Sequence, residues 1–351
     1  MARRIGIKTA ASNGDIALWE PLYTLADQIF ALEPWLFHPE EDLFGVQNPA
    51  TGAISYVCVM GGIGTHCALA LYRGTNGLNG LLKMRAMGDP EQYDSSEILS
   101  WQDCLMLSFE NRDEVSEKQR ARIKALGRSY RGHGNWPHFQ EFVPYRFPWE
   151  VDDAGREWLK VALEQALNVL KRSKSDLLLI PEVEPLGPHL VRVQRQDGAW
   201  EDALLPIAPR TTLGLHPARV ESALVAKLAE KGRVMQRLEL GSIPFPEPMQ
   251  ETPDSAPFFI TALLLVEPDT GMVLGHALAR HEALPTEAQA LLVQALQNHE
   301  ILPSELAVSD LTLARLVKPL TDALEIPLEI YEELPGFEAA AESLLGHVGL
   351  F

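Results

Sequence analysis

The sequence has few cysteines and no long apolar run. Its three cysteines, Cys58, Cys67 and Cys104, each lie in an apolar stretch of the chain. An odd number of thiols in such surroundings argues against a disulfide framework and is typical of a reducing compartment, so we expect a cytoplasmic protein. No stretch approaches about 18 consecutive apolar residues, which excludes a membrane-spanning helix. The start of the chain has no apolar segment long enough for a signal peptide.

Motifs that would assign a reaction are also lacking. The sequence contains no Cys-x-x-Cys pair and no Gly-x-Ser-x-Gly. The glycine cluster Met60–His66 lacks the Lys-Ser/Thr of a nucleotide loop, and a strand follows it, so we interpret it as a hairpin turn. No Ser-His-Asp or Cys-His arrangement can be argued. The sequence therefore does not decide whether the protein is an enzyme, and it implies no cofactor.

Basic residues are scarce at the end of the chain. Residues 241–351 hold seventeen Asp and Glu against three bases, a net charge of -14 out of -18 for the whole chain. The first 240 residues carry the remaining -4. An acidic surface repels nucleic acid and anionic membranes and favours basic partners. We therefore expect a protein partner, for which a basic surface would be favourable.

The pattern of apolar residues predicts an α+β protein with two domains. Residues 14–174 are expected to form the first domain, in which strands joined by tight turns make an antiparallel meander sheet with helices. A capped amphipathic helix over residues 153–174 ends this domain. A run of strands after it, beginning with residues 176–183, is placed in the second domain.

Residues 175–351 are expected to form an acidic α/β domain with a mixed sheet and helices packed on it. Five prolines make residues 244–257 a long loop within this domain. After the loop, an opening hairpin is followed by alternating helices and strands.

Two segments of the first domain are candidates for binding. Residues 128–149 are rich in aromatic residues, and His133, Trp136 and His138 could line a pocket for a small ligand. No zinc pattern accompanies these residues, so structural packing of a long loop is the better explanation of them. A basic run, Lys118 to Arg131, could contact nucleic acid or an acidic partner, although a solvated helix face is the commoner meaning.

Four carboxylates in the second domain suggest a different chemistry. Glu267 and Asp269 end one strand, Asp310 ends the next strand after a helix, and Glu338 opens the last helix. Converging carboxylates can hold Mg²⁺ or Mn²⁺. The order of elements over Phe258–Leu345 resembles a trimmed ribonuclease H-like fold, with one meander strand missing before the helix and Glu267 where an Asp is expected. Turn formation at residues 268–271 and helix capping by Asp310 explain the same residues.

The segments DLFGVQ, ATGAISYVCVMG, WQDCLMLSFENRDE and RGHGNWPHFQEFVPYRFPW resemble a bacterial family built from two domains of unknown function. The resemblance implies two domains and no catalytic residues. Three hypotheses follow. The first is a non-catalytic interaction or regulatory protein. The second is a metal-dependent phosphodiester hydrolase that uses the four carboxylates. The third is a small-ligand binder that uses residues 128–149.

Overall fold

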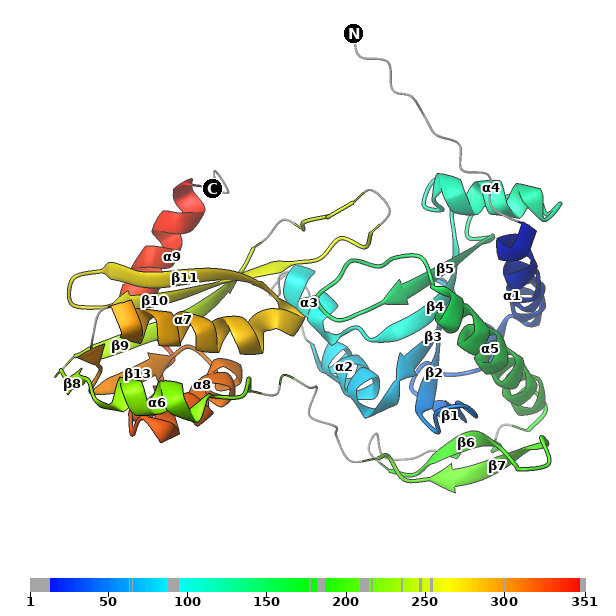
Figure 1. The fold of residues 1–351 in the computed structure, drawn as a ribbon. Helices are drawn as coiled ribbons and strands as arrows, with labels where there is room; N and C mark the ends of the chain where they lie inside the picture. The colour runs from blue at the N-terminus through cyan, green and yellow to red at the C-terminus, as the bar shows by residue number, and fades with distance from the viewer. Residues whose placement is uncertain are drawn as a thin grey trace, which may run out of the picture. The chain divides into compact units, whose positions relative to one another are not determined.

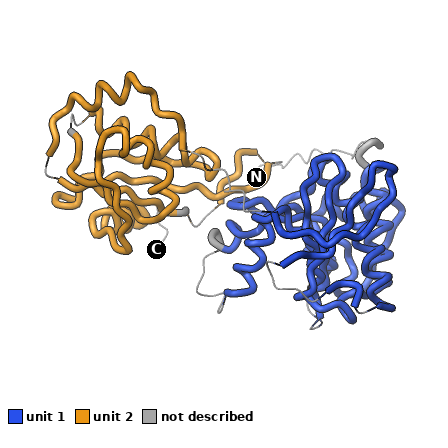
Figure 2. The backbone as a smooth tube through the Cα atoms, turned by 90° about the horizontal axis from the view of Figure 1, so that it is seen from below, with its two compact units in different colours: residues 1–93, 97–211 blue, residues 94–96, 212–351 orange. Residues whose placement is uncertain are grey.

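The computed structural model of the chain describes residues 13–62, 64, 66–87, 95–176, 178–181, 187–208, 215, 217–234, 236–245, 248–252, 255–298 and 301–347. The chain divides into two compact units, residues 1–93 with 97–211 (unit 1) and residues 94–96 with 212–351 (unit 2), as Figure 2 shows. Each unit has its own mixed sheet and its own apolar clusters. The α+β fold class is confirmed.

Unit 1 is built on a seven-stranded sheet with the order β5-β4-β3-β2-β1-β6-β7 (Figure 1). Its strands are β1 (Phe44–Gln47), β2 (Ile54–Met60), β3 (Ala68–Arg73), β4 (Cys104–Glu110), β5 (Trp136–Phe142), β6 (His189–Gln194) and β7 (Trp200–Leu205). Strands β1 to β5 pair antiparallel with their chain neighbours, so the expected meander is confirmed. Sequence reasoning missed β5, which falls inside the aromatic segment.

Helices cover both faces of this sheet. They are α1 (Asn13–Leu32), the 3-10 turn η1 (Pro34–Leu36), α2 (Gly74–Ala86), α3 (Ser95–Trp101), α4 (Glu117–Ala125) and α5 (Asp153–Ser173). α1 and α5 pack together over one face, where Trp19, Phe139 and Leu163 are fully buried. α2 contacts the other face at β2 and β3. Asp152 caps α5 by accepting from the Gly155 amide at 2.7 Å, which is the start expected from the sequence.

The boundary between the units lies later than the sequence suggested. β6 pairs parallel with β1 and antiparallel with β7, so both strands belong to the sheet of unit 1. Unit 1 therefore continues to residue 211 instead of ending at 174. Residues 178–180 of the strand expected at 176–183 form a turn and bends, and residues 177, 182 and 183 lie outside the described residues.

Unit 2 has a five-stranded sheet with the order β11-β10-β9-β13-β14. Its strands are β9 (Arg237–Pro244), β10 (Ile260–Glu267), β11 (Met272–Arg280), β13 (Glu305–Val308) and β14 (Leu328–Ile330), and a separate small pair joins β8 (Gly232–Arg233) to β12 (Ile301–Leu302). β9, β10 and β11 form an antiparallel meander, and β13 runs parallel to β9 and β14. The mixed sheet is as expected, and β9, which precedes residues 258–345, is the third strand of the meander.

The helices of unit 2 are α6 (Ser222–Ala229), the 3-10 turn η3 (His281–Ala283), α7 (Leu284–Asn298), α8 (Leu311–Ala323) and α9 (Pro335–His347). α7 and α8 bury an apolar cluster with Leu240 and Leu263 on one face of the sheet. α9 packs on the opposite face through Phe337. Gly241 allows this approach, because a Cβ there would lie 2.4 Å from the Phe337 ring.

The proline-rich segment of unit 2 is a hairpin arm more than a loose loop. The Phe245 amide donates to the Ile260 carbonyl at 2.8 Å, and Met249 and Phe258 exchange two backbone hydrogen bonds of 2.8 Å. Residues 246–247 and 253–254 of the arm lie outside the described residues. None of the helices in the described ranges has the length and apolar character needed to cross a membrane.

Candidate functional site

Each of the four candidate carboxylates of unit 2 either has a local structural partner or lies in a turn. Glu267 is buried and accepts from the amides of Asp269 (3.0 Å) and Thr270 (3.1 Å) in the turn after β10. The Thr270 hydroxyl and these amides hold the pKa of Glu267 below its usual range. Asp269 itself is an exposed turn residue.

The other two carboxylates sit at helix starts. Asp310 caps α8 by accepting from the Leu313 amide at 2.9 Å, and Glu338 is exposed on α9 and accepts from the Leu334 amide at 3.2 Å. These hydrogen bonds are the helix-capping and turn contacts expected from the local sequence, and they need no metal ion.

Strand direction keeps Glu267 and Asp310 apart. β10 runs antiparallel to β9, and their pairing ends with Val266 opposite Glu239, one residue before Glu267. β13 runs parallel to β9, pairs Val308 with Leu240 and then continues to Asp310. Glu267 and Asp310 therefore lie about four residues apart along the strand direction, roughly 13 Å at the usual rise per residue. No group of three or more His, Cys, Asp or Glu side chains within the described ranges is arranged to hold a metal ion.

Sequence reasoning overlooked one buried acid of this unit, Glu239 in the central strand β9. Its side chain is fully buried, 2.8 Å from Arg237 Nη2, and it accepts from the Phe337 amide at 2.9 Å. Gly336 makes room, because a Cβ there would lie 3.0 Å from Glu239 Oε2. Glu239 thus fixes the first turn of α9 to the sheet, a favourable position for a negative charge.

The aromatic segment of unit 1 separates its three candidate residues. His133 is exposed, with Nδ1 3.1 Å from the Asn111 side-chain oxygen. His138 is buried in β5, opposite Ser108 of β4, and burial lowers its pKa although Glu110, Glu114 and Glu150 oppose the shift. Trp136 is half-buried at the start of β5 and lines a hollow.

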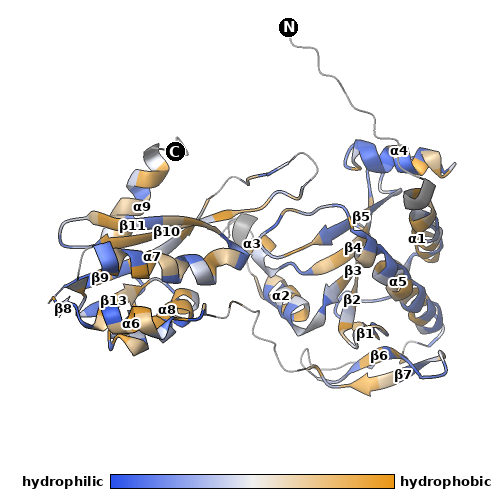
Figure 3. Cartoon of the chain, viewed as in Figure 1, coloured by the Kyte–Doolittle hydropathy of each residue, from blue (hydrophilic) through white to orange (hydrophobic). Residues whose placement is uncertain are grey.

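That hollow, called here the α4 pocket, has a volume of about 340 Å³. It brings three cations of the basic run, Arg120, Lys124 and Arg128, together with Arg112, which precedes α4. Its lining residues are Arg112, Arg120, Ala121, Ile123, Lys124, Arg128, Ser129 and Trp136. None of these described lining residues is acidic. The pocket is therefore lined by four cationic side chains and the indole of Trp136. Figure 3 shows that α4 itself is largely hydrophilic.

Local sequence explains why α4 delivers these cations to one place. Ser116 caps the helix by accepting from the Gln119 amide at 3.2 Å. At the other end Gly127 adopts a left-handed conformation (φ 69°), and its amide donates to the Lys124 carbonyl at 3.0 Å. Such a glycine reverses the chain after a helix, which sends Arg128 back along it.

Two of the four cations are held by protein groups. Arg128 donates from Nη2 to Glu20 and to Thr24 on α1, both at 2.7 Å, and also contacts Asp27. Its pKa is raised, since these partners outweigh the opposing effect of burial. Arg120 donates to the Arg112 carbonyl at 3.0 Å and to the Val115 carbonyl.

The other two cations have no acidic partner among the described residues. The guanidinium of Arg112 lies over the Trp136 ring, with Cζ 5.9 Å from the centroid, a weak cation–π contact. Lys124 is exposed on α4 and lines the pocket. These side chains can pair with an incoming anion without first breaking an ion pair of the protein.

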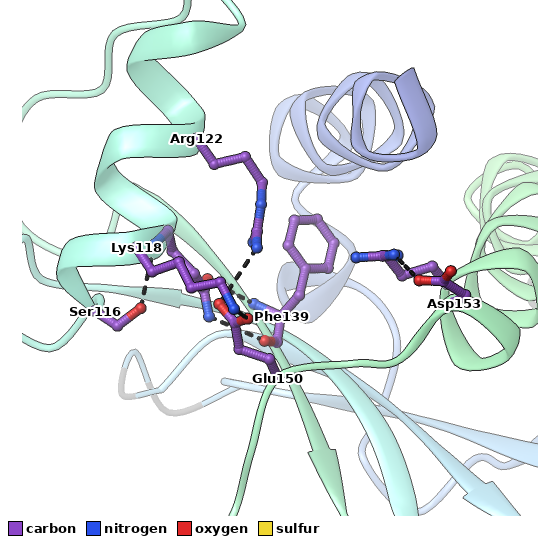
Figure 4. Close-up of polar contacts among 8 residues, drawn as sticks. Ser116, Lys118, Arg122, Phe139, Glu150 and Asp153 are labelled. Carbon is purple, nitrogen blue, oxygen red and sulfur yellow. Dashed lines mark hydrogen bonds and ion pairs between the residues drawn. The ribbon is translucent and has the colours of Figure 1, made fainter. Parts of the chain in front are cut away.

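The opposite side of α4 faces the interior. Arg122 is 3% exposed, stacks on Trp19 with Cζ 3.8 Å from the ring centroid, and approaches Glu150 at 3.3 Å. Figure 4 shows Arg122 pointing from α4 toward Glu150, which also pairs with Lys118. This inner contact anchors the helix, so the cations on its outer side are presented from a fixed support.

Sequence reasoning found part of this pocket. It singled out Trp136 for a ligand and grouped Arg120, Lys124 and Arg128 in a basic run, but it did not join the two sets. Arg112 was missed altogether. It comes before Ser116 and reaches Trp136 only after β4 and β5 have paired, a contact between distant segments that no local pattern signals.

Two family descriptions match the chain. A domain of unknown function, DUF7309, matches residues 19–186, and a second domain of unknown function, DUF6930, matches residues 224–345. The first match contains the α4 pocket and the second contains the five-stranded sheet of unit 2. No curated protein and no solved structure matches the chain.

Proposed function

We propose that this chain, which belongs to a family made of these two adjacent domains of unknown function, is a non-catalytic binding protein that holds a small organic anion in the α4 pocket. The observation that carries the proposal is a hollow of about 340 Å³ lined by four cations and an indole, with no acid among its lining residues. This volume falls at the low end of the range for small-molecule sites.

The two cations without an acidic partner among the described residues, Arg112 and Lys124, define the charge of the ligand. Lys124 and Arg112 supply ammonium and guanidinium donors, which bind phosphate or carboxylate oxygens through charge-assisted hydrogen bonds. Arg120 adds positive potential from a fixed position, whereas Glu20 and Asp27 offset the charge of Arg128. We therefore assign the anionic end of the ligand to the space between Arg112 and Lys124.

The indole defines the remainder of the ligand. Trp136 and Ile123 offer the apolar part of the lining, and an aromatic face prefers a planar or apolar group. A ring-bearing phosphate or carboxylate satisfies both halves of the pocket. An inorganic anion would use only the cationic half and should bind less tightly.

Isothermal titration of the full chain tests this proposal with phenyl phosphate, inorganic phosphate and phenol as probes. We expect phenyl phosphate to bind more tightly than either of its parts. The Lys124→Ala substitution should weaken that binding about tenfold, because a charged hydrogen bond is lost. Lys118→Ala is the matched control, since Lys118 lies on the same helix outside the pocket. Equal affinities in the two variants, or no binding of any probe, would contradict the proposal.

The cellular location and the partner of the protein are two further proposals. A cytoplasmic location is supported by the three free cysteines, of which Cys58 and Cys104 are buried in unit 1. A protein partner with a basic surface is supported by the charge of residues 241–351. The metal-dependent hydrolase hypothesis gains no such support, because its carboxylates serve the turn after β10 and the starts of α8 and α9.

A further inference from the structure

A second hollow lies next to the α4 pocket in unit 1. It has a volume of about 300 Å³ and is called here the Tyr130 pocket. Ser129 lines both hollows. Its neighbours in the chain divide between them, since Arg128 lines the α4 pocket and Tyr130 lines the second hollow. Trp136 and Pro137 divide in the same way, so the two hollows share one stretch of chain as a wall.

Aromatic rings extend from one hollow into the other. The ring of Trp136 in the α4 pocket meets the ring of Tyr130 edge-on, with 6.1 Å between their centroids. Phe30 of α1 and Phe109 of β4 also line the Tyr130 pocket, and their centroids are 4.9 Å apart. The Tyr130 hydroxyl donates to Asp27 at 2.8 Å, which fixes this ring in the wall. A planar group of a ligand can stack on these rings.

The polar lining of the Tyr130 pocket offers both acceptors and donors of hydrogen bonds. The Asp27 carboxylate, 44% exposed, is an acceptor. The Asn135 side chain donates from its nitrogen to the Arg131 carbonyl at 2.6 Å, and its oxygen has no donor among the described residues. The exposed guanidinium of Arg131 is a donor without an acidic partner in the described ranges. One acid and one cation leave this hollow without the excess positive charge of the α4 pocket.

These groups together define what the Tyr130 pocket accepts. A second anionic group would be repelled by Asp27. A benzene ring would stack on the aromatic residues but would leave the hydrogen-bonding groups without partners. An amino-substituted nitrogen heterocycle satisfies both sets, because its amino group donates to Asp27 or Asn135 and its ring nitrogens accept from Arg131. Its faces stack on the aromatic rings as nucleic-acid bases do.

We propose that the Tyr130 pocket binds an amino-substituted nitrogen heterocycle of the same ligand whose anionic group lies in the α4 pocket, so that the ligand is a nucleoside monophosphate with an amino-bearing base. This inference rests on the proposed function, because the phosphate occupies the space between Arg112 and Lys124. The sugar then lies beside Trp136, whose ring adjoins Tyr130.

Isothermal titration of the full chain with three probes tests the proposal. Adenosine 5′-monophosphate has phosphate, sugar and an amino-bearing base, purine riboside 5′-monophosphate lacks the amino group, and ribose 5-phosphate lacks the base. We expect the affinity to fall about tenfold when the base is removed, because stacking is lost. Removing the amino group alone should weaken binding about threefold, as expected for one neutral hydrogen bond. Equal affinities for the three probes would overturn the proposal.

Two substitutions test whether the base lies in the Tyr130 pocket. Arg131→Ala and Phe30→Leu should each weaken the binding of adenosine 5′-monophosphate about fivefold, and neither should change the binding of phenyl phosphate, which occupies the α4 pocket alone. Lys118→Ala is the matched control for Arg131→Ala, because Lys118 is an exposed cation outside both hollows. The circular dichroism spectrum shows that each variant is folded. If neither substitution weakens the nucleotide, or if both weaken phenyl phosphate equally, the base does not lie there and the proposal is wrong.

The same titrations separate the failure of this inference from the failure of the proposed function. Binding of phenyl phosphate that depends on Lys124, together with equal affinities for adenosine 5′-monophosphate and ribose 5-phosphate, would refute the base site and leave the anion site intact. If Lys124→Ala weakens the binding of no probe, the anion site is wrong and the base site is refuted with it.

Discussion

Arg122 shows at the scale of one residue how a buried charge can be tolerated. Its guanidinium is stacked on Trp19 and has Glu150 as its acidic partner, while Nε and Nη1 have no acceptor among the described residues. Burial also raises the pKa of the neighbouring Tyr23 to about 12, although Arg122 opposes this shift. Removing the partner of a buried charge destabilises a protein more than replacing the charge with an apolar side chain.

We therefore expect Glu150→Ala to lower the free energy of unfolding by about 3 kcal/mol, since it leaves Arg122 buried without a counter-charge. Arg122→Met should have a smaller effect, because it keeps the packing on Trp19 and leaves Glu150 paired with Lys118. The double variant should recover most of the loss. Urea unfolding of the three variants measures these differences, and additive losses would refute this view of Arg122.

The lowered pKa of His281 makes the free energy of unfolding depend on pH. Burial lowers its pKa from 6.5 to about 4, with Glu282 opposing the shift. The folded state thus disfavours the protonated ring, and the unfolded state takes up the proton first as the pH falls. The stabilisation is fully present above pH 6.5 and is lost progressively toward pH 4.

Replacing this ring with a side chain that does not titrate should make stability less sensitive to acid. As the pH falls from 6.5 to 4, we expect the free energy of unfolding of His281→Gln to decrease by about 2 kcal/mol less than that of the unsubstituted chain. The lowered pKa values of His38, His138 and His189 leave a residual slope in both proteins. Thermal melting across the pH range measures the difference, and parallel curves would show that His281 does not contribute.

At the scale of one element, α2 depends on glycine for its contact with the end of α3 and the residues that follow it. An added Cβ at Gly80 would lie 1.7 Å from the Trp101 carbonyl oxygen, and one at Gly77 would lie 2.6 Å from the Asp103 oxygen. Backbone atoms cannot move aside as a side-chain end can. The helix therefore needs these glycines for close approach, even though they weaken it intrinsically.

We expect Gly80→Ala to lower the free energy of unfolding by about 3 kcal/mol, since the overlap outweighs a gain of about 1 kcal/mol in helix propensity. Gly346→Ala is the matched control, because this glycine of α9 is exposed and an added Cβ meets nothing within 4 Å. The control should leave stability unchanged or raise it slightly. If both variants melt alike, the close approach of α2 is not required.

Elements with a local signal were predictable, and those defined by distant pairing were not. α5 has a capping Asp152 and regularly spaced apolar residues, so its bounds were expected nearly as observed. β5 was missed because Pro137 and polar residues interrupt its pattern, and only pairing with β4 makes it a strand. β6 was assigned to the wrong side of the boundary because its parallel partner, β1, lies far back in the chain.

At the scale of the whole molecule, the chain combines two self-contained units with different electrostatic character. Each of the four apolar clusters draws its buried residues from one unit alone. The acidic character of residues 241–351 was visible in the sequence, and so were Trp136 and most of the cations of the α4 pocket. Their convergence was not visible, because it depends on how α4 is anchored to the interior of unit 1.

The most direct test of the account is a fluorine NMR spectrum of the full chain labelled with fluorotryptophan, recorded with and without phenyl phosphate. The seven tryptophans give separate probes, and a Trp136→Phe variant identifies the resonance of interest. We expect the Trp136 signal to shift on addition of the probe and to shift much less in Lys124→Ala. A Trp136 signal that stays fixed while the probe binds elsewhere, or an unchanged spectrum, would contradict the assignment of the α4 pocket as an anion site.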